Sequence, residues 1–140
     1  MYKRQVLNSY GPGETIGSVH ITVPDTMTMA DIHPLTKSIA VHLYKKFGIA
    51  MTVGVYAENQ PSVEVLEIRQ ALDQVVSLYT HVVQVHAFYV HEEKKVIYYD
   101  IIFDFDEEDP HGTLEKIKAE MQKRCPEYTQ FAIVDTDFSN

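Results

Sequence analysis

The chain has 140 residues, 45% of them hydrophobic, which is enough for one ordinary domain or for two small modules with real cores. Its 20 acidic and 12 basic residues give a formal net charge of −8, which argues against a nucleic-acid surface. The single cysteine, Cys125, cannot form an internal disulfide, so a reducing cytoplasm fits best. Because no apolar run reaches the ~18 residues of a membrane span and no signal peptide is visible, we expect a soluble chain.

A glycine- and proline-rich turn divides the first predicted hairpin. Gly11-Pro12-Gly13 joins strands expected over residues 6–10 and 15–23, because glycine allows positive φ and proline fixes its own. The abrupt start of the first strand at Val6 predicts a first module that is truncated at its amino end. Since alternate residues of a strand point to opposite faces, His20 lies on the face away from the main core. The core face of its strand carries Val19, Ile21 and Val23.

A capping box begins the first predicted helix. Thr28 offers a hydroxyl at the N-cap, and Asp31 offers a carboxylate three residues later. Pro34 is expected within the first turn, where its missing amide is tolerated, and Gly48 ends the helix. A strand over residues 49–57 follows. The apolar positions of the helix repeat at spacings of three and four: Ile32, Leu35, Ile39, Leu43 and Phe47.

A short polar connection at residues 58–62 is the expected boundary between two modules. Ser62 caps a helix that reaches Tyr79, and two β-rich runs at 82–90 and 96–105 then flank a charged tip. These runs predict a second hairpin.

The second strand of that hairpin has two different faces. One is strongly apolar, with Ile97, Tyr99, Ile101, Phe103 and Phe105, and the other carries Tyr98, Asp100, Ile102 and Asp104. On the hairpin face turned away from the helices we expect Phe88, Val90, Val96, Tyr98 and Ile102 beside His86 and Asp100. This apolar surface is too large to remain exposed to solvent, so the other module or a second chain in a two-fold dimer is expected to cover it.

A final helix and strand complete the pattern. Asp109 is the expected N-cap, Pro110 takes the first helical position, and a strand over 130–137 ends the fold. Both halves therefore read strand, strand, helix, strand, and only the second has a leading helix. We predict an α+β chain of two tandem α-β-β-α-β modules, residues 1–60 and 61–140, the first lacking its leading helix.

Two segments resemble a known family. Ser9-Tyr10-Gly11-Pro12-Gly13 with Val19-His20-Ile21-Thr22-Val23-Pro24-Asp25 is similar to the cytoplasmic C-terminal domain of cation diffusion facilitator (cation efflux) transporters. The closing segment, Ala132-Ile133-Val134-Asp135-Thr136-Asp137-Phe138, resembles the tail of bacterial members with a second copy of this domain.

The resemblance implies a metallochaperone-like, ferredoxin-like fold and a regulatory rather than an enzymatic role. Such a region lies on the cytoplasmic side of the membrane, forms a homodimer, and binds divalent cations, with zinc expected first and manganese, iron or cadmium as alternatives. The family's transmembrane domain is not in this sequence, so this chain alone is not expected to transport.

The resemblance also implies a set of metal ligands. In the first module it gives His20 on a strand and His33 on the helix, while Tyr56 and Glu58 replace two further family positions. In the second module the matching positions hold the more ligand-like set His86, Asp100, Asp135 and Asp137. Each histidine taken singly, and the pair of aspartates, also reads as an ordinary surface group.

Two other functional classes stay open at this point. A duplicated α/β sandwich is also compatible with a small-molecule-binding regulatory module, although no glycine-rich or basic anion-binding loop favours one. An enzyme ranks last, because no nucleophile–base arrangement or phosphate loop is visible.

Overall fold

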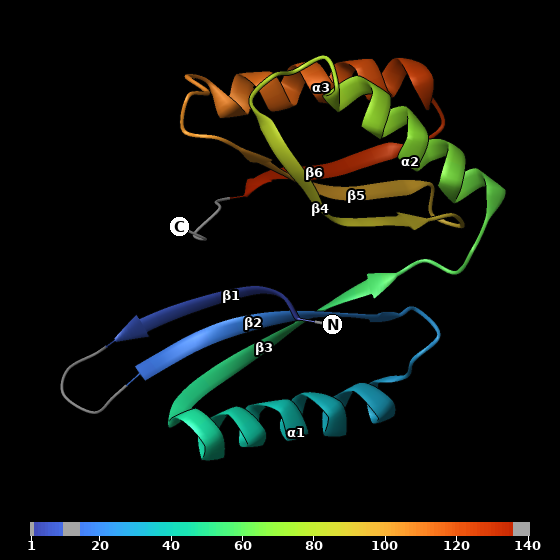
Figure 1. The fold of residues 1–140 in the computed structure, drawn as a ribbon. Helices are drawn as coiled ribbons and strands as arrows, with labels where there is room; N and C mark the ends of the chain where they lie inside the picture. Colours follow the sequence, from blue (N-terminus) through green and yellow to red (C-terminus); the bar gives the residue numbers. More distant parts are fainter. Residues whose placement is uncertain (1, 10–14, 136–140) are drawn as a thin grey trace. The chain divides into compact units, whose positions relative to one another are not determined.

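The structure is a computed structural model that describes the backbone of residues 2–9 and all of residues 15–135 (Figure 1). The chain divides into two compact units, residues 1–60 and the part from Pro61 onwards. Unit 1 contains β1 (Tyr2–Ser9), β2 (Thr15–Pro24), α1 (Met29–Phe47) and β3 (Ile49–Glu58). Unit 2 contains α2 (Val63–Val76), β4 (Val82–His91), β5 (Val96–Phe103), α3 (Pro110–Arg124) and β6 (Thr129–Asp135). The predicted turn at Gly11–Gly13 lies outside the described residues.

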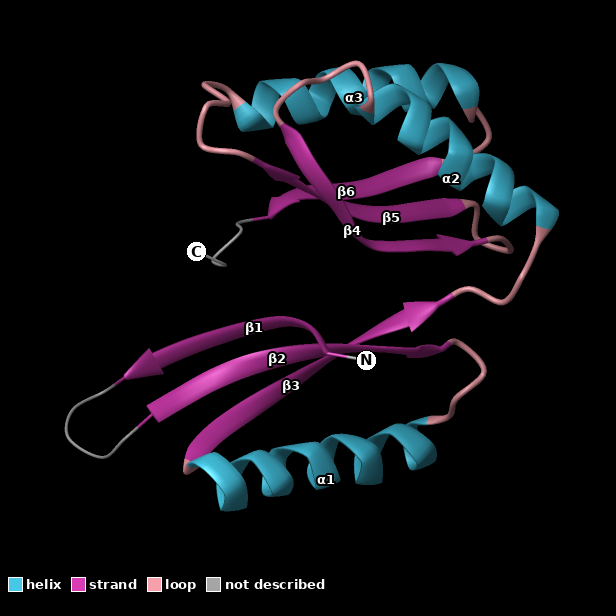
Figure 2. Ribbon diagram, in the orientation of Figure 1, coloured by secondary structure: helices cyan, strands magenta, loops and turns pink. Residues whose placement is uncertain are grey.

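Each unit has a three-stranded sheet with its helices on one face (Figure 2). The strand orders are β1-β2-β3 and β4-β5-β6, and in both the first pair is antiparallel and the second parallel. A helix connects the two parallel strands, as such a crossover requires. Within the described residues the strand–strand–helix–strand order thus occurs twice, with the additional helix α2 before the second copy, and the predicted α+β class is confirmed.

The helices begin where their sequence signals predict. Thr28 and Asp31 form both bonds of the capping box, and Gly48 ends α1 in the left-handed region at φ 67°. Ser62 caps α2, and Asp109 caps α3 by accepting a hydrogen bond from the Gly112 amide. One detail was wrong: because α1 begins at Met29, Pro34 lies in its second turn rather than its first.

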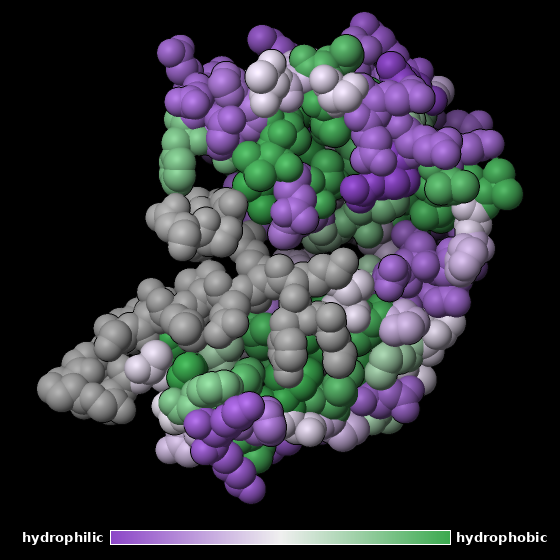
Figure 3. All heavy atoms as spheres, in the orientation of Figure 1, coloured by the Kyte–Doolittle hydropathy of each residue, from purple (hydrophilic) through white to green (hydrophobic). Residues whose placement is uncertain are grey.

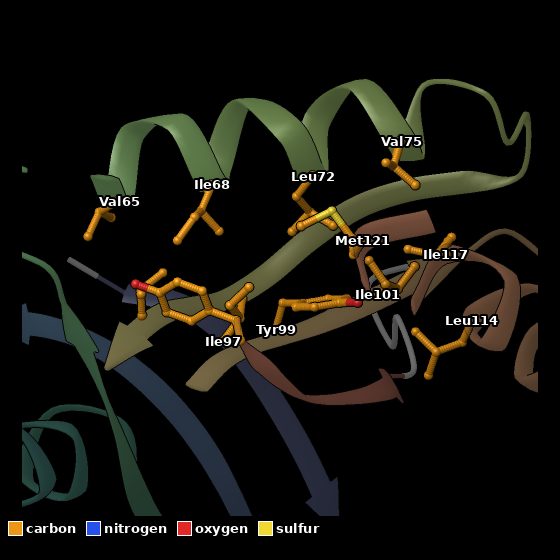
Figure 4. Packing of buried hydrophobic residues seen from close by; sticks show 12 residues of the cluster. Val65, Ile68, Leu72, Val75, Ile97, Tyr99, Ile101, Leu114, Ile117 and Met121 are labelled. Atoms are coloured by element: carbon orange, nitrogen blue, oxygen red, sulfur yellow. The ribbon is translucent and has the colours of Figure 1, made fainter. Parts of the chain in front are cut away.

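The apolar face of each sheet packs against its helices. In unit 2, α2 and α3 enclose the β5 side chains Ile97, Tyr99 and Ile101, all 0% exposed (Figure 4). In unit 1, the β2 side chains pack against Ile39 of α1. Hydrophilic side chains gather on the outer side of the unit 2 helices, with apolar ones visible beneath them (Figure 3). The helix residues in the unit 2 core are Val65, Ile68, Leu72, Val75, Leu114, Ile117 and Met121.

We call the sheet face away from the helices the open face. A β-bulge in β4 changes which residues of that strand lie on it, so part of the predicted open face is wrong. His86 pairs with Asp100 but Tyr89 pairs with Tyr98, so one extra residue is inserted, and Ala87 takes φ 54°. A slip of one residue moves every later side chain to the opposite face. The prediction for Phe88 and Val90 was therefore wrong: both pack into the helix-side core, where Val90 is 1% exposed.

The end of β5 also differs from the prediction. The strand stops at Phe103, the Asp106 amide donates to Asp104 Oδ1 at 3.0 Å, and the chain turns away from the sheet. Phe105, expected on the apolar strand face, is consequently 88% exposed in the connection to α3.

Shortening a core side chain of α2 should destabilise the protein far more than shortening an exposed one. We expect Leu72→Ala to lower the free energy of unfolding by about 2–5 kcal/mol, because Leu72 is 0% exposed. Leu66→Ala is the matched control in the same helix, since Leu66 is 58% exposed. Urea unfolding followed by circular dichroism measures both, and equal losses would contradict the assigned face of α2.

Candidate metal centre

A group of three potential metal ligands lies at one end of the β4–β5 hairpin. His81 directly precedes β4, and Asp104 directly follows β5. The Asp104 amide donates to the His81 carbonyl at 2.9 Å, which extends the antiparallel pairing beyond Val82 and Phe103 and holds the two residues opposite each other. The turn after Asp104 then brings Asp106 back to the same place. We call His81, Asp104 and Asp106 the loop site.

The donor atoms of the loop site converge. One ligand atom from each of the three residues lies within 4.8 Å of the other two. His81 Nδ1 is 3.0 Å from Asp104 Oδ1, and both side chains are 39% exposed, so an ion has access from solvent. An imidazole and two carboxylates are a donor set for zinc, manganese and similar ions, and three protein ligands leave room for water.

The electrostatics of the loop site favour positive charge. The hydrogen bond to Asp104 is the main cause that raises the pKa of His81 above its ordinary 6.5. Desolvation is the next largest effect and opposes it, while the charges of Asp104, Glu107 and Asp106 each add a smaller upward contribution to the pKa. Residues 104–109 contain five carboxylates and no basic side chain. Protonated His81 partly neutralises this segment, and a divalent cation would do so more strongly.

The predicted ligands of unit 2 lie elsewhere, on the open face. His86 is directly opposite Asp100, and Asp135 is opposite Ile102 on the neighbouring strand, so the three share one face. Each already interacts with other groups of the protein. Among the described residues they do not form a three-ligand group as tight as the loop site. Asp137 lies outside the described residues.

The predicted ligands of unit 1 are not brought together. His20 lies on the open face opposite Gly54, with its ring centroid 5.1 Å from that of Tyr56. His33 is exposed on α1, which packs on the other face of the same sheet. Tyr56 pairs with Thr22 as Asp135 pairs with Ile102, so an aromatic ring in unit 1 takes the place of a carboxylate in unit 2.

The sequence interpretation missed the loop site for two reasons. His81 falls between the predicted helix and the first strand of the second hairpin, where the pattern gives it no partner, and the predicted strand over 96–105 includes Asp104. The run of acidic residues at 104–109, beginning where an apolar strand pattern stops, was a signal for an early strand end. It could not reveal that His81 lies opposite.

No protein-family model matches the chain, and no curated protein matches it.

The contact between His20 and Gly54 can be tested by a double-mutant cycle. A Cβ at position 54 would lie 2.1 Å from His20 Cδ2, so Gly54→Ala should lower the free energy of unfolding by about 1–3 kcal/mol. In a His20→Ala background most of this loss should disappear, because the clashing ring is gone. Urea midpoints of the four proteins measure the coupling, and additive effects would contradict the packing of the ring on Gly54.

The His81–Asp104 pair predicts a pH dependence with a definite sign. Because the pKa of His81 is raised in the folded state, the pair stabilises the fold below about 6.5, and this contribution is lost as pH rises through the folded pKa. Asp104→Asn should lower the His81 pKa towards 6.5, and Asp106→Asn should lower it less. NMR titration of the imidazole measures this shift, and an unchanged pKa in Asp104→Asn would contradict it.

Proposed function

We propose that this protein is a regulatory module that binds a divalent cation, and that the loop site holds the ion. The observation that carries the proposal is the convergence of one imidazole and two carboxylates, from two segments far apart in the sequence, within 4.8 Å. Zinc is the first candidate, because imidazole with carboxylate is a common zinc donor set; manganese, iron and cadmium are the alternatives. The proposed role is binding rather than catalysis.

The wider proposal is that the chain is the regulatory and dimerisation region of a divalent cation efflux transporter. Its support is the resemblance of Ser9–Gly13 and Val19–Asp25 to the cytoplasmic domain of that family, together with the repeated α+β unit. In the described part of the chain, no helix combines the length and apolar character needed to cross a membrane. A separate transmembrane domain, a cytoplasmic location and a homodimer belong to this proposal.

In this proposal, cation binding regulates the protein by raising the stability of its folded state. An ion that binds the folded state and not the unfolded state stabilises the fold by an amount that grows with its concentration. At the loop site it would join the start of β4 to the segment between β5 and α3 and relieve the repulsion between Asp104 and Asp106. Both effects fall within unit 2.

Zinc titration of the full chain tests the proposal. We expect a calorimetric binding signal and a rise in melting temperature with zinc concentration. His81→Ala should weaken zinc binding by at least about tenfold, the lower range seen when even an outer-shell partner of a metal ligand is removed. Asp106→Asn should weaken it as well, since it removes one anionic donor.

His86→Ala is the matched control, because it removes an imidazole from the same unit but from the open face. Unchanged zinc affinity in this variant, with loss in His81→Ala, supports the loop site. The reverse result would move the ion to His86, Asp100 and Asp135. No zinc binding by the wild-type chain would refute the proposed function.

A further inference from the structure

Glu107 links the loop site to the first turn of α3. It follows Asp106 directly, and its amide donates to the Asp104 carbonyl at 3.3 Å. Its side-chain Oε1 accepts hydrogen bonds from the Asp109 amide at 3.2 Å and from Thr113 Oγ1 at 2.9 Å. Glu107 therefore shares its backbone with the loop site and directs its carboxylate to the helix.

Both partners of Glu107 are important for the start of α3. Asp109 is the N-cap: its Oδ1 accepts from the Gly112 amide at 3.1 Å, and its carbonyl accepts from the Thr113 amide at 3.0 Å. Thr113 is 8% exposed and precedes Leu114, which belongs to the unit 2 core. A loosened cap would thus expose helix amides and disturb packing in the first turn.

We infer that a divalent cation at the loop site acts on the amino end of α3, with Glu107 as the residue that transmits the effect. This inference rests on the proposed function and adds the element through which it is regulated. Without the ion, Asp104 and Asp106 repel each other, and the segment that carries Glu107 opens more readily. The ion fixes Asp104 and Asp106, which holds Glu107 against Asp109 and Thr113. The first turn of α3 then opens less often when the loop site holds an ion.

Amide hydrogen exchange, measured by NMR on the full chain with and without saturating zinc chloride, tests the inference. Exchange at the Gly112 and Thr113 amides should slow by about tenfold with zinc, because local opening of the cap becomes rarer. The Val65 amide, which donates to the Ser62 cap of α2, should not change. Calorimetry on the same samples reports zinc binding independently.

Two variants separate transmission from binding. Glu107→Ala removes no ligand of the loop site but does remove a nearby negative charge, so it should weaken zinc binding by no more than about threefold while it abolishes the slowing at Gly112 and Thr113. Glu108→Ala, at the next position, should keep both zinc binding and the slowing. Thr113→Val removes only the hydroxyl contact, so it should reduce the effect and serves as the second variant if Glu107→Ala does not fold.

The outcomes are distinct. Zinc binding by the wild-type chain without slower exchange would overturn the inference and leave the proposed function standing. Slowing that persists unchanged in Glu107→Ala and in Thr113→Val would overturn the role of Glu107. Absence of zinc binding would overturn both the inference and the proposed function.

Discussion

The parallel pairing of two strands around one helix is the constraint on which each unit depends. β2 pairs with β3 and β5 with β6 in parallel, so α1 and α3 must each cross over one face of their sheet. The side chains that alternate towards that face become the core, as Ile21 and Ile101 show by being 0% exposed. The remaining side chains, His20 and Asp100 among them, are left on the open face. The crossover thus decides which residues can perform chemistry on the sheets.

Local sequence signals predicted the helices and the faces of regular strands well. Thr28, Ser62 and Asp109 cap their helices because an N-cap depends only on the next three residues. The alternation around Val19 and Ile97 was also correct, since both strands stay regular there. These features could be read from the sequence because each is determined within one turn or one strand.

The failures occurred where non-local pairing decided the outcome. Phe88 and Val90 changed faces because of a bulge that places Ala87 and Phe88 opposite the single residue Tyr99, and alanine gives no warning of a left-handed conformation. The chain turns away from the sheet after Asp104 instead of continuing to Phe105, and this turn forms the loop site. His81 is 23 positions away in the sequence. Only the register of β4 against β5 reveals that these two residues meet.

In each unit the connection between the second strand and the helix forms a backbone hydrogen bond to a neighbouring strand, but that strand is a different one in the two units. The side chains that meet the connection therefore differ as well. After β2, the Asp25 amide donates to the carbonyl of Glu58 on the parallel strand β3. After β5, the Asp104 amide donates instead to His81 at the start of the antiparallel strand β4. The same fold therefore directs the first connection towards the strand that follows the helix, β3, and the second connection towards the first strand of the hairpin, β4. The second arrangement brings the His81 imidazole to the acidic segment, so the loop site depends on a contact that unit 1 makes with a different strand.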